Sequence, residues 1–354
     1  MNKKSLALIE ELKEYFPFDD KLSKSDEKEL LNNTNNFNSE WAQVVYDYFY
    51  SHLDESGNIV SLNQFLQSDK TRQDYYKKVE ETFIKNLFSK YPPLFFFDVD
   101  DTLTDGGKLS QQKIDYIKNY AQKNRIVLTT GKTYDSIKNV IDDLELSSKY
   151  ASCLNGSVLV KNGVFTTLEK IGAESKKIVE YFKNAPFDLV VYYEDNIRLV
   201  KELNEKSLNH LRTYSEAYYK EDKIDYNRVV KVLFFIFDGE DEKEKMVDEY
   251  VKKHKDLISL RTTKNTYEIL KKTQHKGTTV KKIAEQLNYH YRASIGVGDS
   301  MNDSSLLSHV GKPFVVSTAS DDLKSFGYEV LEPNRDEDIV NLIKKYTKGE
   351  NYEQ

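Results

Sequence analysis

The sequence lacks the features that would point to an extracellular or membrane protein. Cys153 is the only cysteine among 354 residues, so no disulfide can form within one chain, which fits a reducing compartment. The aromatic-rich apolar runs at residues 94–97 and 232–237 are far too short to span a bilayer. An apolar stretch near the start ends at Glu10, before it reaches the length of a signal-peptide core. We therefore expect a cytoplasmic protein that makes no membrane contact.

An excess of basic charge and a cluster of histidines are also missing. The formal net charge of -6 argues against a general nucleic-acid binder. The six histidines have no metal-ligand spacing, and only His275 stands beside a motif described below. Hydrophobic residues make up 39% and charged residues 31%, which is typical of a soluble globular protein. The length allows two or three domains.

The first part of the chain, residues 1–90, has a helical and polar pattern. Its apolar residues recur near helical spacing, as in the segment from Trp41 to Phe49. Tyr91-Pro92-Pro93 then interrupts the pattern, because proline cannot continue a helix. We expect an N-terminal all-helical region at residues 1–90. This region could form a homo-oligomer or bind a protein partner, although an ordinary helical core explains its tyrosines equally well.

From Leu94 onward, strand-like and helix-like patterns alternate, which is the pattern of a parallel sheet covered by helices. Residues 91–157 and 273–354 are predicted to form a Rossmann-like α/β core. Its main predicted elements are strands at 94–98, 126–129, 293–297, 314–316 and 329–331, and helices at 110–123, 133–144, 276–287 and 336–346.

Residues 158–272 are predicted to be an inserted α/β domain with its own sheet. Asn162-Gly163 lies between two strand-like runs, which is a strong hairpin signal. Strands are expected at 189–193 and 230–237, and helices at 174–183, 202–219 and 241–253. The polar segment that begins at Tyr192 could face a substrate, or it could be a strand end exposed to water.

Three carboxylates follow the apolar strand at 94–97, and they are the most informative feature of the chain. Asp98, Asp100 and Asp101 lie at the carboxyl end of this strand, where open α/β sheets bind ligands. Crowded carboxylates repel one another unless a cation or a proton joins them, and Mg²⁺ prefers oxygen ligands. Asp98 could be a nucleophile, and Asp100 could act as general acid and base. Read alone, the motif could also be an acidic turn.

Three further motifs follow in order. Thr130-Gly131 follows an apolar strand and could hold a phosphoryl oxygen. Lys276, at a predicted helix start, could balance charge on a transferring phosphoryl group. Asp299 follows another strand and could complete a Mg²⁺ site, with Asn302 and Asp303 on the next helical turn. Each motif alone could be a capped turn or a solvated helix end.

The combination resembles the haloacid dehalogenase-like (HAD) superfamily of phosphohydrolases, and most closely its Cof-type group. The resemblance covers about residues 94 to 346. It implies a cap domain between the second and third motifs and a Mg²⁺ cofactor. The matching segments are FFFDVDDTLTDGG, VLTTGK, LNGS, HKGTTVKKIAEQL and GVGDSMNDSSLL.

The resemblance implies a role for each matching position. Asp98 would form an aspartyl-phosphate, Asp100 would be the general acid and base, and Thr130 and Lys276 would be the other catalytic residues. The residues implied to bind Mg²⁺ are Asp98, Asp100 (through its backbone carbonyl), Asp299 and Asp303. The residues implied to bind substrate are Thr130, Gly131, Asn155, Lys276 and Asn302.

Two positions depart from the family pattern. Asp101 stands where Cof-type members often have glycine, and Lys132 stands where arginine is more usual. Lysine keeps the charge of arginine but loses its bidentate fork.

The resemblance predicts a Mg²⁺-dependent phosphatase for a small phosphorylated metabolite, such as a sugar phosphate. Two alternatives stay open. One is a phosphomutase or phosphotransferase of the same superfamily. The other is an interaction or oligomerisation module at residues 1–90 that carries a phosphatase domain.

Overall fold

The computed structural model describes residues 84, 87–88, 92–121, 125–147, 149–213, 217–220 and 223–347. The contacts within the chain divide it between Pro92 and Pro93, and the fold described below is that of the second unit, Pro93–Gln354. The predicted helical region at residues 1–90 lies outside the described residues, apart from positions 84, 87 and 88. In the part of the chain that is described, no helix is long and apolar enough to cross a membrane.

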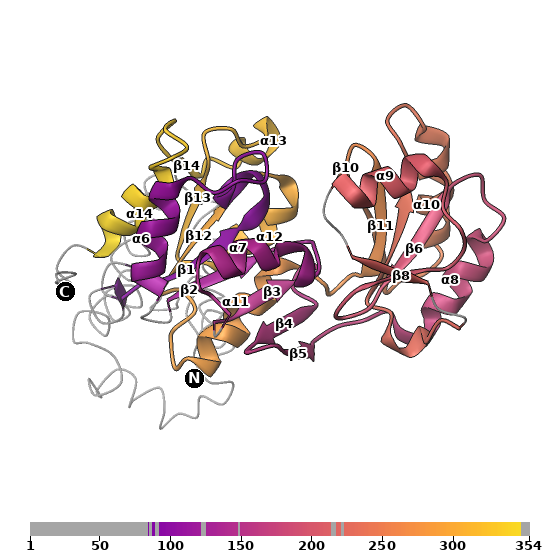
Figure 1. Cartoon of the computed structure of the whole chain (residues 1–354), viewed down its shortest axis with the longest axis horizontal. Coiled ribbons are helices and arrows are strands. Elements are labelled where there is room, and N and C mark those ends of the chain that lie inside the picture. Colours follow the sequence, from indigo (N-terminus) through magenta and orange to yellow (C-terminus); the bar gives the residue numbers. More distant parts are fainter. Residues whose placement is uncertain are drawn as a thin grey trace, which may run out of the picture. The chain divides into compact units, whose positions relative to one another are not determined.

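In its described residues, this unit contains two sheets, and the first of them has eight strands (Figure 1). Its strand order is β14-β13-β12-β1-β2-β3-β4-β5, and all neighbours from β14 to β3 are parallel. The predicted α/β fold with a parallel sheet is therefore confirmed. The strands are β1 Leu94–Asp98, β2 Ile126–Thr129, β3 Ala151–Cys153, β4 Val158–Lys161, β5 Val164–Thr167, β12 Ser294–Gly298, β13 Lys312–Val315 and β14 Glu329–Val330.

Helices cover both faces of this sheet, which explains why its central strand β1 is apolar from Leu94 to Phe97, before it ends at Asp98. Leu94 and Phe96 on one face pack in a cluster with residues of α11 and α12, such as Val280. Phe95 on the other face contacts Tyr120 of α6, with ring centroids 5.6 Å apart. The helices of this part are α6 Gln111–Ala121, α7 Lys138–Asp143, α11 Lys276–Gln286, α12 Ser304–His309, α13 Asp321–Lys324 and α14 Asp338–Thr347.

The helix predicted at 133–144 is shorter than expected. A 3₁₀ turn at Asp135–Ile137 precedes α7, which begins only at Lys138. The hydroxyl of Thr133 accepts a hydrogen bond from the backbone N–H of Ser136, which closes a turn before the helix.

The hairpin predicted around Asn162-Gly163 joins β4 to β5, and both residues have positive φ angles of 52° and 72°. Such angles suit the tight turns that connect antiparallel strands. The hairpin pairs with β3 and extends the first sheet, although we placed it in the inserted segment 158–272. The boundary at residue 158 stays a prediction, and the strand order favours a start after Thr167.

A second sheet of six strands lies within the inserted segment (Figure 1), with the order β10-β11-β9-β6-β7-β8. Only β7 and β8 are parallel among its pairs in the described residues. Its strands are β6 Asp188–Tyr192, β7 Ile197–Leu199, β8 Tyr218–Lys220, β9 Lys231–Phe235, β10 Leu257–Thr263 and β11 Thr266–Lys271. The helices are α8 Ser175–Phe182, α9 Glu205–Thr213 and α10 Asp241–Val251. The predicted helix 202–219 is therefore wrong at its end, where β8 begins at Tyr218.

One face of the second sheet forms a hydrophobic core with α8 and α10. Val232 and Phe234 of β9 belong to this core, together with Phe182 of α8 and Val247 of α10. Side chains alternate between faces along a strand, so Lys231 and Leu233 lie on the opposite face.

Gly156 lies where the turn after β3 meets the start of α11, and it gives the first testable prediction. Its φ is +84°, and an added Cβ would clash with the backbone carbonyl of His275. Gly156→Ala should lower the free energy of unfolding by about 2–5 kcal/mol, from left-handed strain plus overpacking. Gly163→Ala is the matched control, because its φ is +72° but nothing lies within 4 Å. Urea denaturation measures both, and equal losses would contradict the predicted clash.

Candidate active site

The carboxyl ends of three neighbouring parallel strands bring together the first, second and fourth of the predicted motifs. Asp98 is the final residue of β1, and the strand order β12-β1-β2 places β1 in the middle. Thr130 directly follows β2, and Asp299 directly follows β12. Residues separated by some two hundred positions in the chain thus meet at one edge of the sheet, where α/β folds bind ligands.

Lys276 is the first residue of α11 and joins two of the carboxylates. Its Nζ donates to Oδ1 of Asp98 at 2.5 Å and to Oδ1 of Asp303 at 2.6 Å. The Lys276 side chain is fully buried. Burial alone would lower the pKa of Lys276, but Asp303 and Asp98 outweigh it and raise the pKa above its usual value. Lys276 is therefore a fixed cation between two buried anions.

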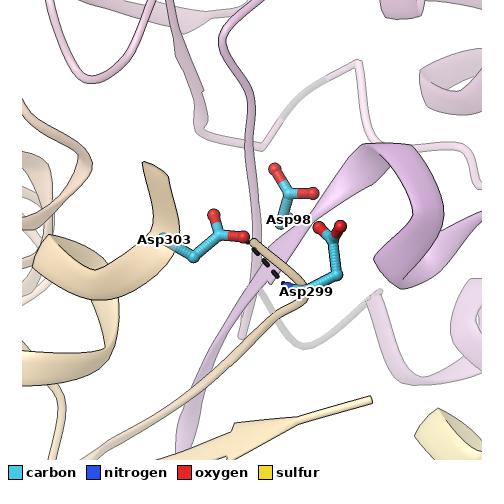
Figure 2. A group of neighbouring side chains, drawn as sticks. All are labelled: Asp98, Asp299 and Asp303. Carbon is cyan, nitrogen blue, oxygen red and sulfur yellow. Dashed lines mark hydrogen bonds between the residues drawn. The ribbon is translucent and has the colours of Figure 1, made fainter. Parts of the chain in front are cut away.

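Asp98, Asp299 and Asp303 form a cluster in which one carboxylate oxygen from each lies within 4.8 Å of the others (Figure 2). Burial raises the pKa of Asp98 well above its usual value, and the Asp303 carboxylate raises it further, while Lys276 lowers it. Burial and Asp303 together raise the pKa of Asp299 to about 6. Three carboxylates against one ammonium leave excess negative charge, and their hard oxygen atoms fit a divalent cation such as Mg²⁺.

Both oxygens of Asp303 already accept hydrogen bonds. Oδ1 accepts from Lys276, and Oδ2 accepts from the backbone N–H groups of Asp299 and Ser300, at 3.0 and 3.2 Å. The first of these backbone contacts is the dashed line in Figure 2. Asp303 therefore fixes the turn that carries Asp299.

The segment after Asp98 is a single turn that places Asp100 and Thr102 at the site. Asp100 Oδ1 accepts from Lys132 Nζ at 2.8 Å. Thr102 donates its hydroxyl to Asp299 Oδ1 at 3.1 Å, which links the first motif to the fourth. Arg335 donates to the backbone carbonyls of Asp101 and Thr102, at 2.9 and 2.7 Å, and so holds this turn from outside.

Thr130, Gly131 and Asn155 lie together beside β2. Thr130 is buried, and its hydroxyl accepts from the backbone N–H of Lys132 at 3.1 Å. The backbone carbonyl of Thr130 accepts from the N–H of Asn155, whose left-handed φ of 54° turns the chain after β3. An added Cβ on Gly131 would lie 3.1 Å from Asn155 Oδ1, so glycine permits this close approach.

A cavity of about 330 Å³ lies over this edge of the sheet and is lined by residues of both sheets. Six of the predicted site residues line it: Asp98, Asp100, Gly131, Asn155, Asp299 and Asn302. Thr130, Lys276 and Asp303 are not among its lining residues, but Lys276 contacts both Asp98 and Asp303 directly. The other lining residues are Asp101, Lys132, Tyr192, His210, Lys231, Leu233, Thr262, Thr263, Thr266, Glu268 and Ser300.

The cavity wall contributed by the second sheet was not predicted, apart from the suggestion that the segment beginning at Tyr192 could face a substrate. Tyr192 does line the cavity, whereas Tyr193 belongs to the hydrophobic core of the other face. His210, not His275, is the histidine that lines it. Lys231, as the one charged residue of β9, was the only local signal, because the rest of the strand is apolar on both faces and only the core contacts of Val232 and Phe234 show which face is which.

Comparisons with known proteins agree with this geometry. A family model for haloacid dehalogenase-like hydrolases matches residues 95–343. Phosphatase YwpJ of Bacillus subtilis is 25% identical over 145 residues, which span 40% of this chain and 48% of that relative. The phosphoglycolate phosphatase of Sulfolobus acidocaldarius is 23% identical over 73% of this chain and 97% of its own length.

A solved structure of a HAD subclass IIB sugar phosphatase, BT4131, shares the fold. It superposes with a TM-score of 0.60 at 18% identity, over 72% of this chain and 98% of that one. The relatives named as phosphatases support the predicted class of enzyme. The family model covers well over half of the chain, including all four motifs. The chain therefore belongs to the haloacid dehalogenase-like hydrolase family.

Proposed function

We propose that this hydrolase is a Mg²⁺-dependent phosphatase that acts on a small phosphorylated metabolite through an aspartyl-phosphate. The observation that carries the proposal is the buried contact between Asp98 and Lys276, next to Asp299, at the edge of the cavity. The Asp98 carboxylate must approach a phosphate group that is also negatively charged. The neighbouring Lys276 ammonium lowers the electrostatic repulsion between them. The cavity volume of about 330 Å³ suits a small metabolite.

The proposed reaction divides into two displacements at phosphorus. An oxygen of Asp98 attacks the phosphorus atom, and the bond to the ester oxygen breaks. Asp100 gives its proton to that oxygen. Water then attacks the phosphorus of the acyl phosphate, Asp100 takes a proton from the water, and Asp98 leaves as a carboxylate. The contact of Asp100 with Lys132 keeps its carboxyl group beside the cavity between the two steps.

Asp98 and Asp299 are the side chains proposed to hold Mg²⁺, together with the backbone carbonyl of Asp100. Bound Mg²⁺ would supply positive charge that offsets the charge of the phosphate and the carboxylates. Asp303 would support the site by fixing the Asp299 turn, because its oxygens already accept from Lys276 and backbone N–H groups. Thr130, Gly131, Asn155 and Asn302 would bind the phosphate or the rest of the substrate.

Removing the metal gives a direct test of this assignment. Dialysis of the intact chain against EDTA should lower phosphate release at least about 100-fold, because only one ammonium then offsets the charge of the three clustered carboxylates. Adding Mg²⁺ should restore the rate, whereas adding NaCl to the same ionic strength should not. Full activity after exhaustive chelation would contradict the proposed metal.

A panel of phosphomonoesters with the intact chain and Mg²⁺ tests the function itself. The expected result is release of inorganic phosphate from at least one sugar phosphate or related ester, abolished in Asp98→Asn. Isomerisation of a hexose phosphate without phosphate release would instead favour the phosphomutase alternative. Hydrolysis of no member of the panel would contradict the proposal.

An interaction role for residues 1–90 stays a prediction, since they lie outside the described part of the chain apart from positions 84, 87 and 88.

A further inference from the structure

Glu268 is a buried carboxylate on the cavity wall that the proposed chemistry does not use. It lies on β11 with 3% of its surface exposed, and it lines the cavity. Its Oε1 accepts from Lys231 Nζ at 2.6 Å. Its Oε2 is buried and has no hydrogen-bond partner among the residues that the structure describes. A buried carboxylate oxygen without a hydrogen bond costs free energy, which a donor on a bound ligand would recover.

Lys231 is fully engaged and fixes the position of Glu268. Besides the ion pair, its Nζ donates to the backbone carbonyl of Gly131 at 3.0 Å and lies 4.4 Å from the centre of the Tyr192 ring. Lys231 and Tyr192 are register partners on β9 and β6, so the sheet itself sets their spacing. Because Lys231 also reaches the phosphate-binding side at Gly131, Glu268 is held close to the reaction site.

The charges along the cavity disfavour an anionic leaving group. Both lysines that line it have carboxylate partners: Lys231 pairs with Glu268, and Lys132 pairs with Asp100. Burial lowers the pKa of His210 to about 4, so this imidazole is neutral near pH 7. A carboxylate on the leaving group would therefore be repelled by the Glu268 carboxylate, and neither lysine that lines the cavity would be left to pair with it.

The neighbouring groups on this wall are hydroxyls. Thr262, Thr263 and Thr266 line the cavity, and the hydroxyl of Thr266 hydrogen-bonds with those of Thr262 and Thr263 at 3.0 and 2.7 Å. Hydroxyl groups both donate and accept, so this wall can bind a chain of alcohol groups. The core side adds Asn155 Oδ1, which is also buried and has no partner within the described ranges.

We propose that Glu268, positioned by Lys231, accepts a hydrogen bond from a hydroxyl of the leaving group and so selects neutral polyhydroxylated phosphomonoesters over anionic ones. This inference rests on the proposed phosphatase function and adds its substrate class. An ionised carboxylate can only accept, so it distinguishes a hydroxyl from an alkyl carbon or a carboxylate. Sites that hydrogen-bond a substrate hydroxyl reject analogues without it far better than apolar pockets reject an extra methylene.

Four probe esters separate this inference from the proposed function in the unmodified chain. Sorbitol 6-phosphate offers hydroxyls, n-hexyl phosphate offers none, phosphoglycolate carries a carboxylate, and phosphoethanolamine carries an ammonium. We expect kcat/KM for sorbitol 6-phosphate to exceed each of the others by at least about tenfold. If none of the four is hydrolysed, this inference fails, and the broader panel of phosphomonoesters decides whether the proposed function fails with it. If the esters are hydrolysed but another matches or exceeds sorbitol 6-phosphate, only this inference is overturned.

Variants of Glu268 test whether this residue is the source of the preference. Glu268→Gln keeps the shape but removes the charge and replaces one carboxylate oxygen with an N–H₂ donor. We expect kcat/KM for sorbitol 6-phosphate relative to phosphoglycolate to fall at least about tenfold, with n-hexyl phosphate within about threefold of the unmodified chain. Glu268→Met, which removes the acceptor without adding a donor, should show the same change. Glu202→Gln is the matched control, because this exposed glutamate also pairs with a lysine, Lys220 of β8, and does not line the cavity.

The pattern over substrates separates a specificity role from a structural one. A structural role predicts equal losses for all four esters, and that result would overturn the inference. If both Glu268 variants fail to fold, as judged by circular dichroism, the ratios measured with the unmodified chain decide the question alone. A preference for sorbitol 6-phosphate that survives in either folded variant would also overturn it.

Discussion

Asp98→Asn is expected to lower kcat for phosphate release by about 10⁴-fold or more, since loss of a nucleophile removes the covalent pathway itself. Asparagine is similar in shape to aspartate, but its amide oxygen is a poor nucleophile. The fold should survive. Burial and the Asp303 carboxylate hold the pKa of Asp98 well above its usual value, so the charged form is unfavourable in the folded protein. Removing that charge should leave the melting temperature unchanged or raise it.

The matched control for this prediction is Asp105→Asn. Asp105 is an exposed acid seven positions further along the same segment, and its backbone forms an isolated bridge with Lys108. The kcat of Asp105→Asn should stay within about twofold of that of the unmodified chain. Mass spectrometry must show that the asparagine introduced at position 98 has not deamidated to aspartate. An intact asparagine variant that retains a tenth of the activity would exclude Asp98 as the nucleophile.

The position of this nucleophile was predictable from the sequence because strand ends are local signals. Asp98, Thr130 and Asp299 each follow a short apolar run, and parallel strands bring their carboxyl ends to one edge. The hairpin at Asn162-Gly163 was equally readable, since two residues with positive φ suit few other turns. In each case a short sequence determines the local structure.

The wall opposite the nucleophile was not predictable in the same way. The run from Val232 to Phe237 looks uniformly apolar, so it indicates a buried strand without showing which side faces a ligand. The assignment depends on α8 and α10 packing against Val232 and Phe234, a tertiary contact between distant segments. The place of Glu268 on the cavity wall also depends on a tertiary contact, because β11 pairs with β9 and brings Glu268 to Lys231.

Lys276→Met is expected to lower both stability and activity, because it removes a cation from between two buried carboxylates. Breaking a buried ion pair by deleting one partner costs about 3–5 kcal/mol of folding free energy. Activity should also fall about 10³-fold, since the ammonium that opposes phosphate charge is gone. Urea denaturation and phosphate release measure the two effects. Lys282→Met, an exposed change on the same helix α11, is the control and should alter neither appreciably.

A second substitution separates the electrostatic loss from the catalytic one. In Lys276→Met with Asp303→Asn, one of the two unpaired carboxylates becomes a neutral amide, so part of the lost stability should return. Activity should not return, because no ammonium faces the phosphate. Mg²⁺ should also raise the melting temperature of Lys276→Met more than that of the unmodified chain, since the cluster then lacks its own cation. Recovery of activity in the double variant would show that Lys276 serves only to neutralise Asp303.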